Sequence, residues 1–200
     1  MTDPASRQVF WRDEKYLTEQ REAVELIDTI LEEYRDLMKE DFVAYRNHCQ
    51  RVYGFLLYLL PEPFDPSVLQ KCAIAVAFHD IGIWTDNTVD YIDPSRKVAK
   101  DYLTYKGLSH WIEEVDLMIE RHHQVLQGNL PENSLTNIFR KADLVDFSLG
   151  YVTQGLPLYI VRSMLAAYAN EGFHVRLLQL AVGRLWTHPL SPAPMMRWSS

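Results

Sequence analysis

The chain has 200 residues, of which 48% are hydrophobic and 12% aromatic, which suffices for one domain with a packed core and excludes a disordered chain. Glycine is scarce, at 8 residues, which argues against the many tight hairpins of a β-sandwich or β-barrel. The formal net charge of −7 excludes a broad basic face for duplex nucleic acid.

The cysteines and the apolar runs indicate the compartment. Cys49 and Cys72 make neither a disulfide framework nor a CxxC site. The most apolar run, residues 52–60, is nine residues long, whereas a membrane-spanning helix needs about 20. The first fifteen residues lack the apolar core of a signal sequence. We therefore expect a soluble, cytoplasmic protein with no membrane segment.

The hydrophobic pattern predicts helices along most of the chain, and no segment alternates in the manner of a strand. Asp65-Pro66 and Asp93-Pro94 are helix starts, because Asp is a favoured N-cap and Pro a favoured first helical residue. The stretch at 72–78 is apolar on every side, which is typical of a central, buried helix. The predicted helices cover about residues 16–40, 41–60, 65–80, 93–107, 109–126, 132–150, 157–171 and 173–186.

These elements predict an all-α fold, a single-domain bundle of about seven to nine helices over residues 1–187. No repeat or linker divides this region. Residues 188–200 contain three prolines and three serines, and we expect them to form an irregular C-terminal tail.

Polar side chains interrupt several helix faces that should be apolar. They lie on or beside the inward stripes of three helices and at the end of the apolar one, and they are His48, His79, Asp80, His122, His123, Asp143 and Asp146. A single inward histidine is usually a core residue bonded to a carbonyl, and a single inward aspartate is usually a cap or ion-pair partner. Four histidines and three aspartates together instead predict a divalent-metal centre, because imidazole and carboxylate are its usual ligands.

The order of these residues resembles that of the HD-domain superfamily of metal-dependent phosphohydrolases. The resemblance spans about residues 40–150 and rests on four strings: HxxRV at 48–52, AFHDIG at 77–82, HH at 122–123 and ADxxD at 142–146. It implies one divalent metal (Mn, Mg, Co, Fe, Ni or Zn), with a second metal left open. The ligands that it implies are His48, His79, Asp80 and Asp143.

The resemblance also implies roles for the remaining polar residues. Periodicity alone favours Asp146 as a ligand, but the family pattern selects Asp143, so that Asp146 orients a ligand or helps in proton transfer. His122 and His123 match positions that in some branches hold a second metal or contact the phosphate. Many members carry Lys after HDIG, whereas this chain has Ile83; Arg51 is the expected replacement as the cation that meets phosphate.

Two further segments bear on the substrate. The GYP motif of the cyclic-di-GMP-cleaving branch is absent from the sequence, so we do not assign that substrate. Residues 84–93 are expected to form a loop over the pocket. Within it, Trp84 and Tyr91 either stack on a base or simply pack the loop.

The resemblance implies a hydrolase that cleaves a small phosphate ester, such as a nucleotide, by attack of a metal-activated water. Two alternatives stay open: an HD-fold di-iron oxygenase, and a non-catalytic regulatory or scaffold module with a structural metal. The expected partner is a small phosphorylated substrate, with neither duplex nucleic acid nor a membrane, and a homodimer is left open.

Overall fold

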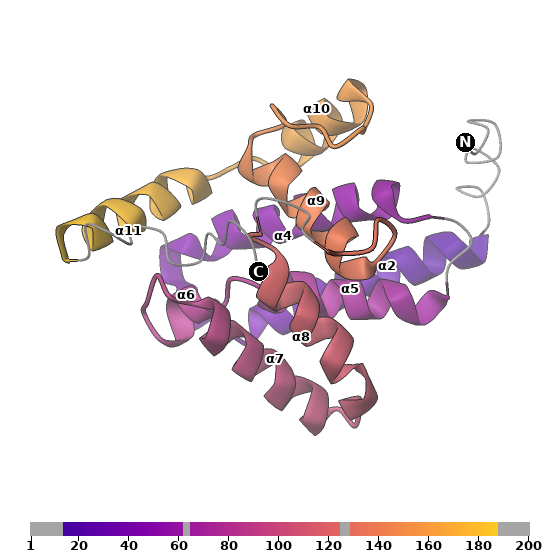
Figure 1. Cartoon of the computed structure of the whole chain (residues 1–200), viewed down its shortest axis with the longest axis horizontal. Coiled ribbons are helices and arrows are strands. Elements are labelled where there is room, and N and C mark those ends of the chain that lie inside the picture. The colour runs from indigo at the N-terminus through magenta and orange to yellow at the C-terminus, as the bar shows by residue number, and fades with distance from the viewer. Residues whose placement is uncertain (1–13, 62–64, 125–128, 188–200) are drawn as a thin grey trace.

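Helices make up nearly all the regular structure of the computed structural model, which describes residues 14–61, 65–124 and 129–187 (Figure 1). Within those ranges there is no β-strand. Eight helices have ten or more residues: α2 (Glu14–Glu32), α4 (Phe42–Leu59), α5 (Pro66–Phe78), α7 (Ile92–Tyr105), α8 (Ile112–Arg121), α9 (Leu135–Phe147), α10 (Leu158–Ala167) and α11 (Phe173–Thr187). The predicted all-α bundle is therefore confirmed.

Two short helices and two 3₁₀ turns complete the described elements. They are α3 (Arg35–Met38), α6 (Gly82–Thr85), and the turns Lys39–Asp41 and Ser109–Trp111. The predicted single helix over 16–40 is interrupted, since α2 ends at Glu32 and a separate helix, α3, follows. No proline or glycine marks this break; instead the Tyr34 ring packs edge-on against Phe78, with centroids 6.1 Å apart.

Local signals account for the start of α5 but not for that of α7. Asp65 caps α5 by accepting a hydrogen bond from the Ser67 backbone N–H at 2.8 Å, with Pro66 in the first turn. The predicted Asp93 cap is wrong, because α7 begins at Ile92. Asp93 instead lies in the first turn and accepts a hydrogen bond from Arg96 at 3.0 Å.

The apolar helix α5 lies at the centre of the bundle, as its composition predicts. Its residues from Cys72 to Phe78 are all buried, and it packs against α2, α4, α7 and α8. The helix α9 packs against both α4 and α8, so these helices surround the end of α5. In Figure 1, α10 and α11 (orange to yellow) lie outside this group, with α11 pointing away from it.

The remaining expectations concern membrane insertion, the two ends of the chain and the cysteines. No described helix combines the length and the hydropathy needed to cross a bilayer. The predicted tail at 188–200 and the first thirteen residues of the predicted domain lie outside the described residues. Both cysteines are buried and unpaired.

Candidate metal centre

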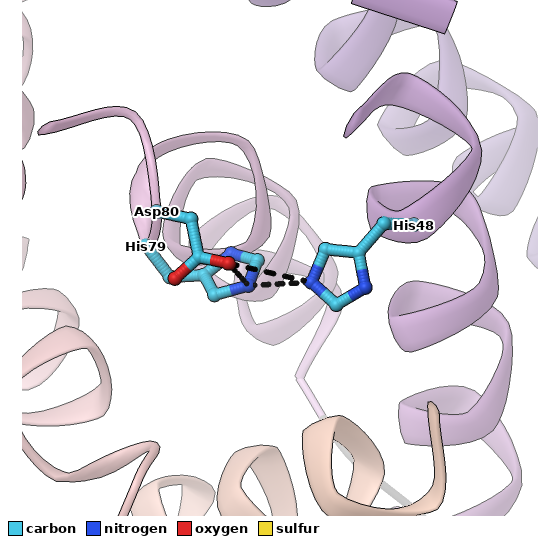
Figure 2. Close-up of side chains that lie close together, drawn as sticks. All are labelled: His48, His79 and Asp80. Atoms are coloured by element: carbon cyan, nitrogen blue, oxygen red, sulfur yellow. Dashed lines mark hydrogen bonds and ion pairs between the residues drawn. The ribbon is translucent and has the colours of Figure 1, made fainter. Parts of the chain in front are cut away.

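Three predicted ligands meet where α4 passes the end of α5 (Figure 2). Nε2 of His48 lies 2.9 Å from Nε2 of His79. Oδ2 of Asp80 lies 3.7 Å from the first nitrogen and 3.4 Å from the second. All three side chains are buried, and one donor atom from each lies within 4.8 Å of the others. This donor set fits a divalent metal ion.

Asp143, the fourth predicted ligand, approaches the same point from α9. Its Oδ1 lies 3.7 Å from Nε2 of His48 and 3.8 Å from Nε2 of His79. The carboxylate is buried. The fold therefore brings together all four residues that the sequence pattern selects, from positions 95 residues apart (143 − 48).

Hydrogen bonds at Nδ1 set the tautomer of each buried histidine. Nδ1 of His79 lies 2.7 Å from the Val76 carbonyl, and Nδ1 of His122 lies 2.6 Å from the Ile119 carbonyl. A carbonyl only accepts, so each Nδ1 carries a proton, and in the neutral ring each Nε2 is left with a lone pair. Nδ1 of His48 likewise donates to a carboxylate at 2.7 Å.

The short distance between the Nε2 atoms of His48 and His79 fits a cation that both atoms could bind. With both rings neutral and protonated at Nδ1, His48 and His79 point lone pairs at each other across 2.9 Å. Two nitrogens that bind one metal at 2.0–2.1 Å and at right angles lie about 3 Å apart. A shared cation is thus the partner that fits both atoms.

A second group of donors shares Asp80 with the first. It comprises Asp80, His122 and His123, with one donor atom from each within 4.8 Å of the others. Oδ1 of Asp80 lies 3.3 Å from Nε2 of His122, yet among the described residues neither atom makes a hydrogen bond. Buried polar atoms without partners are rare, and these two also fit a cation.

His123 differs from the other histidines because both of its nitrogens face polar side chains. Its Nε2 is hydrogen-bonded to the hydroxyl of the buried Tyr91 at 2.5 Å, and its Nδ1 lies 3.7 Å from Oδ2 of Asp143. Tyr91 therefore orients His123 instead of presenting its ring for stacking. Trp84 is also buried, and its indole N–H donates to Asp41 at 3.0 Å, so both aromatics pack the segment.

The charges of the centre do not balance. Three buried carboxylates (Asp80, Asp143, Asp146) and the Arg51 guanidinium that contacts Asp146 leave −3 + 1 = −2 when the histidines are neutral. Burial raises the pKa of Asp143 to about 6, and burial lowers the pKa of His79 to about 3. A divalent cation would neutralise the excess charge.

Asp146 and Arg51 form a hydrogen-bonded pair that holds the ring of His48 in place. Asp146 accepts from Nδ1 of His48, and it accepts from Arg51 Nε at 2.5 Å and Nη2 at 2.9 Å. Burial opposes the ionisation of Asp146, but the hydrogen bonds from Arg51 and His48 outweigh it and lower its pKa to about 2. Arg51 is 0% exposed and also donates to the Tyr168 and Ala169 carbonyls, at 2.9 and 3.2 Å. This placement favours a supporting role over the predicted contact with phosphate.

A pocket opens beside the second group of donors. His122, His123 and Asp143 line one part of it, and the other lining residues are Gln124, Arg140, Leu144 and Phe147. The sequence reasoning missed Arg140 and Gln124. Arg140 precedes Asp143 by three residues, so helical spacing puts both on one face and would have identified it.

Comparison with known proteins adds no relative to this picture. No protein-family model, curated protein or solved structure matches the chain at a significant level. Buried His and Asp groups of this chain could therefore hold a metal ion.

Proposed function

We propose that the protein is a metal-dependent phosphohydrolase that cleaves a small phosphate ester. The observation that carries the metal is the pair of Nε2 atoms of His48 and His79, which lie 2.9 Å apart beside buried carboxylates. The phosphohydrolase part rests on the strings that resemble the HD-domain superfamily. The pocket next to the centre supports it, because a substrate there lies beside His123 and Asp143.

The residues of the centre have separate tasks in this proposal. His48, His79, Asp80 and Asp143 would hold the divalent metal, which activates water and neutralises charge on a phosphoryl oxygen. Asp146 and the Val76 carbonyl keep the two imidazole rings in the ligating tautomer.

His123 is the proposed proton carrier of the site. It lines the pocket, and the Tyr91 hydroxyl holds its Nε2. This arrangement leaves Nδ1 to exchange a proton with the substrate's leaving oxygen.

Metal analysis combined with a hydrolysis screen tests the proposal. We expect purified protein to bind metal and to hydrolyse some member of a panel of nucleotides and simple phosphate esters. His79→Gln and Asp80→Asn should each lose the metal and lower the hydrolysis rate by about 100-fold or more, because each removes a ligand. The matched control is His110→Gln, which changes an exposed histidine outside the centre. Full metal content and full activity in both centre variants would refute the site.

The second donor group favours one alternative, an iron-dependent oxygenase. Asp80 belongs to both groups and can bridge two ions, with His122 and His123 on the second. This alternative predicts two irons per chain, an iron-dependent absorption band and oxygen consumption. A colourless protein that hydrolyses phosphate esters with manganese or magnesium excludes it. Absence of any turnover with metal restored, together with a lower melting temperature of His79→Gln, would instead indicate a structural metal.

A further inference from the structure

Two of the proposed ligands lie on a turn that follows the end of α5. The helix stops at Phe78, and the next described element, α6, begins at Gly82. His79 and Asp80 lie in the turn between the two helices. Because the last carbonyl groups of a helix have no partner within it, groups from elsewhere are needed to hold the backbone here.

The hydroxyl of Tyr45, on α4, bridges this turn. It donates a hydrogen bond to the Ala77 carbonyl at 3.0 Å and accepts one from the backbone N–H of Asp80 at 3.2 Å. A phenolic hydroxyl both donates and accepts, so a single oxygen atom can link the two sides of the turn. The backbone of a proposed ligand is thus held by a side chain from another helix.

The ring of Tyr45 is enclosed by other rings, which fix the direction of the hydroxyl. The residue is 0% exposed, and its ring centroid lies 4.7 Å from that of Trp84, 6.1 Å from that of His48 and 6.0 Å from that of His79. A phenylalanine would fill the same space, so packing alone does not require the hydroxyl. A buried hydroxyl costs free energy unless it is hydrogen-bonded, and here it is bonded to the turn that carries the ligands.

Tyr45 shares one face of α4 with a proposed ligand. His48 and Cys49 follow it by three and four residues, which places all three side chains on the same side of the helix. The Cys49 thiol donates to the Val76 carbonyl at 3.3 Å, and Nδ1 of His79 donates to the same carbonyl at 2.7 Å. This face of α4 therefore supplies one ligand and also fixes the segment that supplies two others.

The carboxylate of Asp80 depends most on this support. An aspartate side chain is short, so the position of its oxygen atoms follows that of its backbone. Its Oδ2 lies 3.7 Å from Nε2 of His48 and 3.4 Å from Nε2 of His79 (Figure 2), and Asp80 belongs to the second group of donors as well. A shift of the backbone at Asp80 would therefore disturb both groups.

We propose that Tyr45 is a positioning residue of the metal centre, whose hydroxyl holds the backbone at Asp80 so that the carboxylate can reach the ion. The inference rests on the metal-binding part of the proposed function and adds to it a residue that is not itself a ligand. Without the hydroxyl, the Asp80 N–H and the Ala77 carbonyl lose a buried partner, and the turn has to move to find others.

Tyr45→Phe removes only the hydroxyl, and titration with Co²⁺ measures the effect on the centre. Co²⁺ is a suitable probe because its visible absorption depends on the number and the arrangement of its ligands. We expect Tyr45→Phe to bind Co²⁺ about 10- to 100-fold more weakly than the unmodified protein and to give a changed spectrum. The matched control is Tyr53→Phe, which alters another buried tyrosine of α4, about two turns farther along. It should leave both the affinity and the spectrum unchanged, even where both variants melt at a lower temperature.

Hydrogen exchange tests the bond to Asp80 itself, without metal and without activity. In chelator-treated protein, the Asp80 amide should exchange about 10-fold faster or more in Tyr45→Phe, relative to the amides in the middle of α5. The comparison within one protein removes the effect of a general loss of stability. In Tyr53→Phe the relative rate should stay the same. An unchanged relative rate in Tyr45→Phe would show that the hydroxyl does not hold this turn and would overturn the inference.

The outcomes distinguish this inference from the proposed function. An unchanged Co²⁺ affinity and spectrum in Tyr45→Phe, in a protein that binds the ion, would refute the positioning role and retain the metal centre. The expected changes in Tyr45→Phe, with no hydrolysis of any phosphate ester by the unmodified protein, would refute the phosphohydrolase and retain the role of Tyr45. An unmodified protein that binds no Co²⁺ would refute both.

Discussion

At the scale of single residues, the orientation of His48 depends on a hydrogen-bond acceptor, Asp146, that is not itself one of the proposed metal ligands. The ring of His48 is fixed on three sides: Asp146 accepts from Nδ1, Phe173 stacks on the ring with centroids 4.2 Å apart, and Nε2 faces His79. Such supporting contacts orient a ligand and raise its basicity. The aspartate is itself held by Arg51, so one buried chain of hydrogen bonds links metal-binding atoms to the backbone at 168–169.

Replacing that acceptor should weaken metal binding without removing a ligand. We expect Asp146→Asn to lower the metal affinity by about 10- to 100-fold, as measured by competition with a chromophoric chelator. The matched control is Asp116→Asn, which breaks a similar two-point pair with Arg96 at a partly exposed position. It should leave the metal affinity unchanged and cost at most about 1 kcal/mol of stability. An unchanged affinity in Asp146→Asn would contradict the supporting role.

At the scale of elements, the glycine of the AFHDIG string has a packing role. The Gly82 backbone N–H donates to the buried Ser95 hydroxyl at 2.9 Å. A Cβ at this position would lie 2.4 Å from the Tyr91 carbonyl oxygen and 3.0 Å from the Ser95 nitrogen, both backbone atoms. Only a residue without a side chain lets α6 approach the start of α7 this closely. The same approach sets the position of Tyr91 beside His123.

Gly82→Ala should therefore push these two helices apart. We expect a loss of about 1 to 3 kcal/mol in the free energy of unfolding, measured by urea denaturation, and weaker restraint of His123. The comparison is Gly54→Ala in α4, whose Cβ would meet only the flexible end of Met164, with Cε at 2.1 Å. That methionine can rotate away, so the cost there should be smaller. The reverse order of the two costs would argue against the backbone contact.

At the scale of the whole molecule, the centre joins segments that are otherwise held by apolar packing. Its donors come from α4, from the end of α5, from the end of α8 and from α9. Without a cation, the buried carboxylates repel one another across these elements. We therefore expect metal binding to stabilise the bundle.

Removal of the metal should lower the melting temperature. A metal present at 100 times its dissociation constant adds about 2.7 kcal/mol, which corresponds to about 5 to 10 °C for a chain of this size. Calorimetric scans with and without a chelator measure the difference. In His79→Gln the chelator should have little effect, because the site is already broken. An identical melting temperature for the unmodified protein in both conditions would show that no metal is coupled to folding.

The sequence was sufficient for the helices and for the inward polar residues, but not for what surrounds them. Helical spacing predicts that His48, His122 and Asp146 face inward, and all three are buried. The spacing carries no information on contacts between distant elements. The bonds of Arg51 to carbonyls 117 and 118 residues away follow only from the packing of the 168–169 segment on α4.

The large sequence separation of the residues that contact His48 has a consequence for the order of folding. His48 and Asp146 are 98 residues apart, and the Phe173 ring lies against His48. Contacts between such distant positions form only after the intervening chain has closed a long loop, which costs conformational entropy. A ribosome-bound chain that stops before residue 173 cannot assemble the finished environment of His48. We therefore expect the candidate metal centre to be completed late in synthesis, after nearly the whole helical bundle has packed.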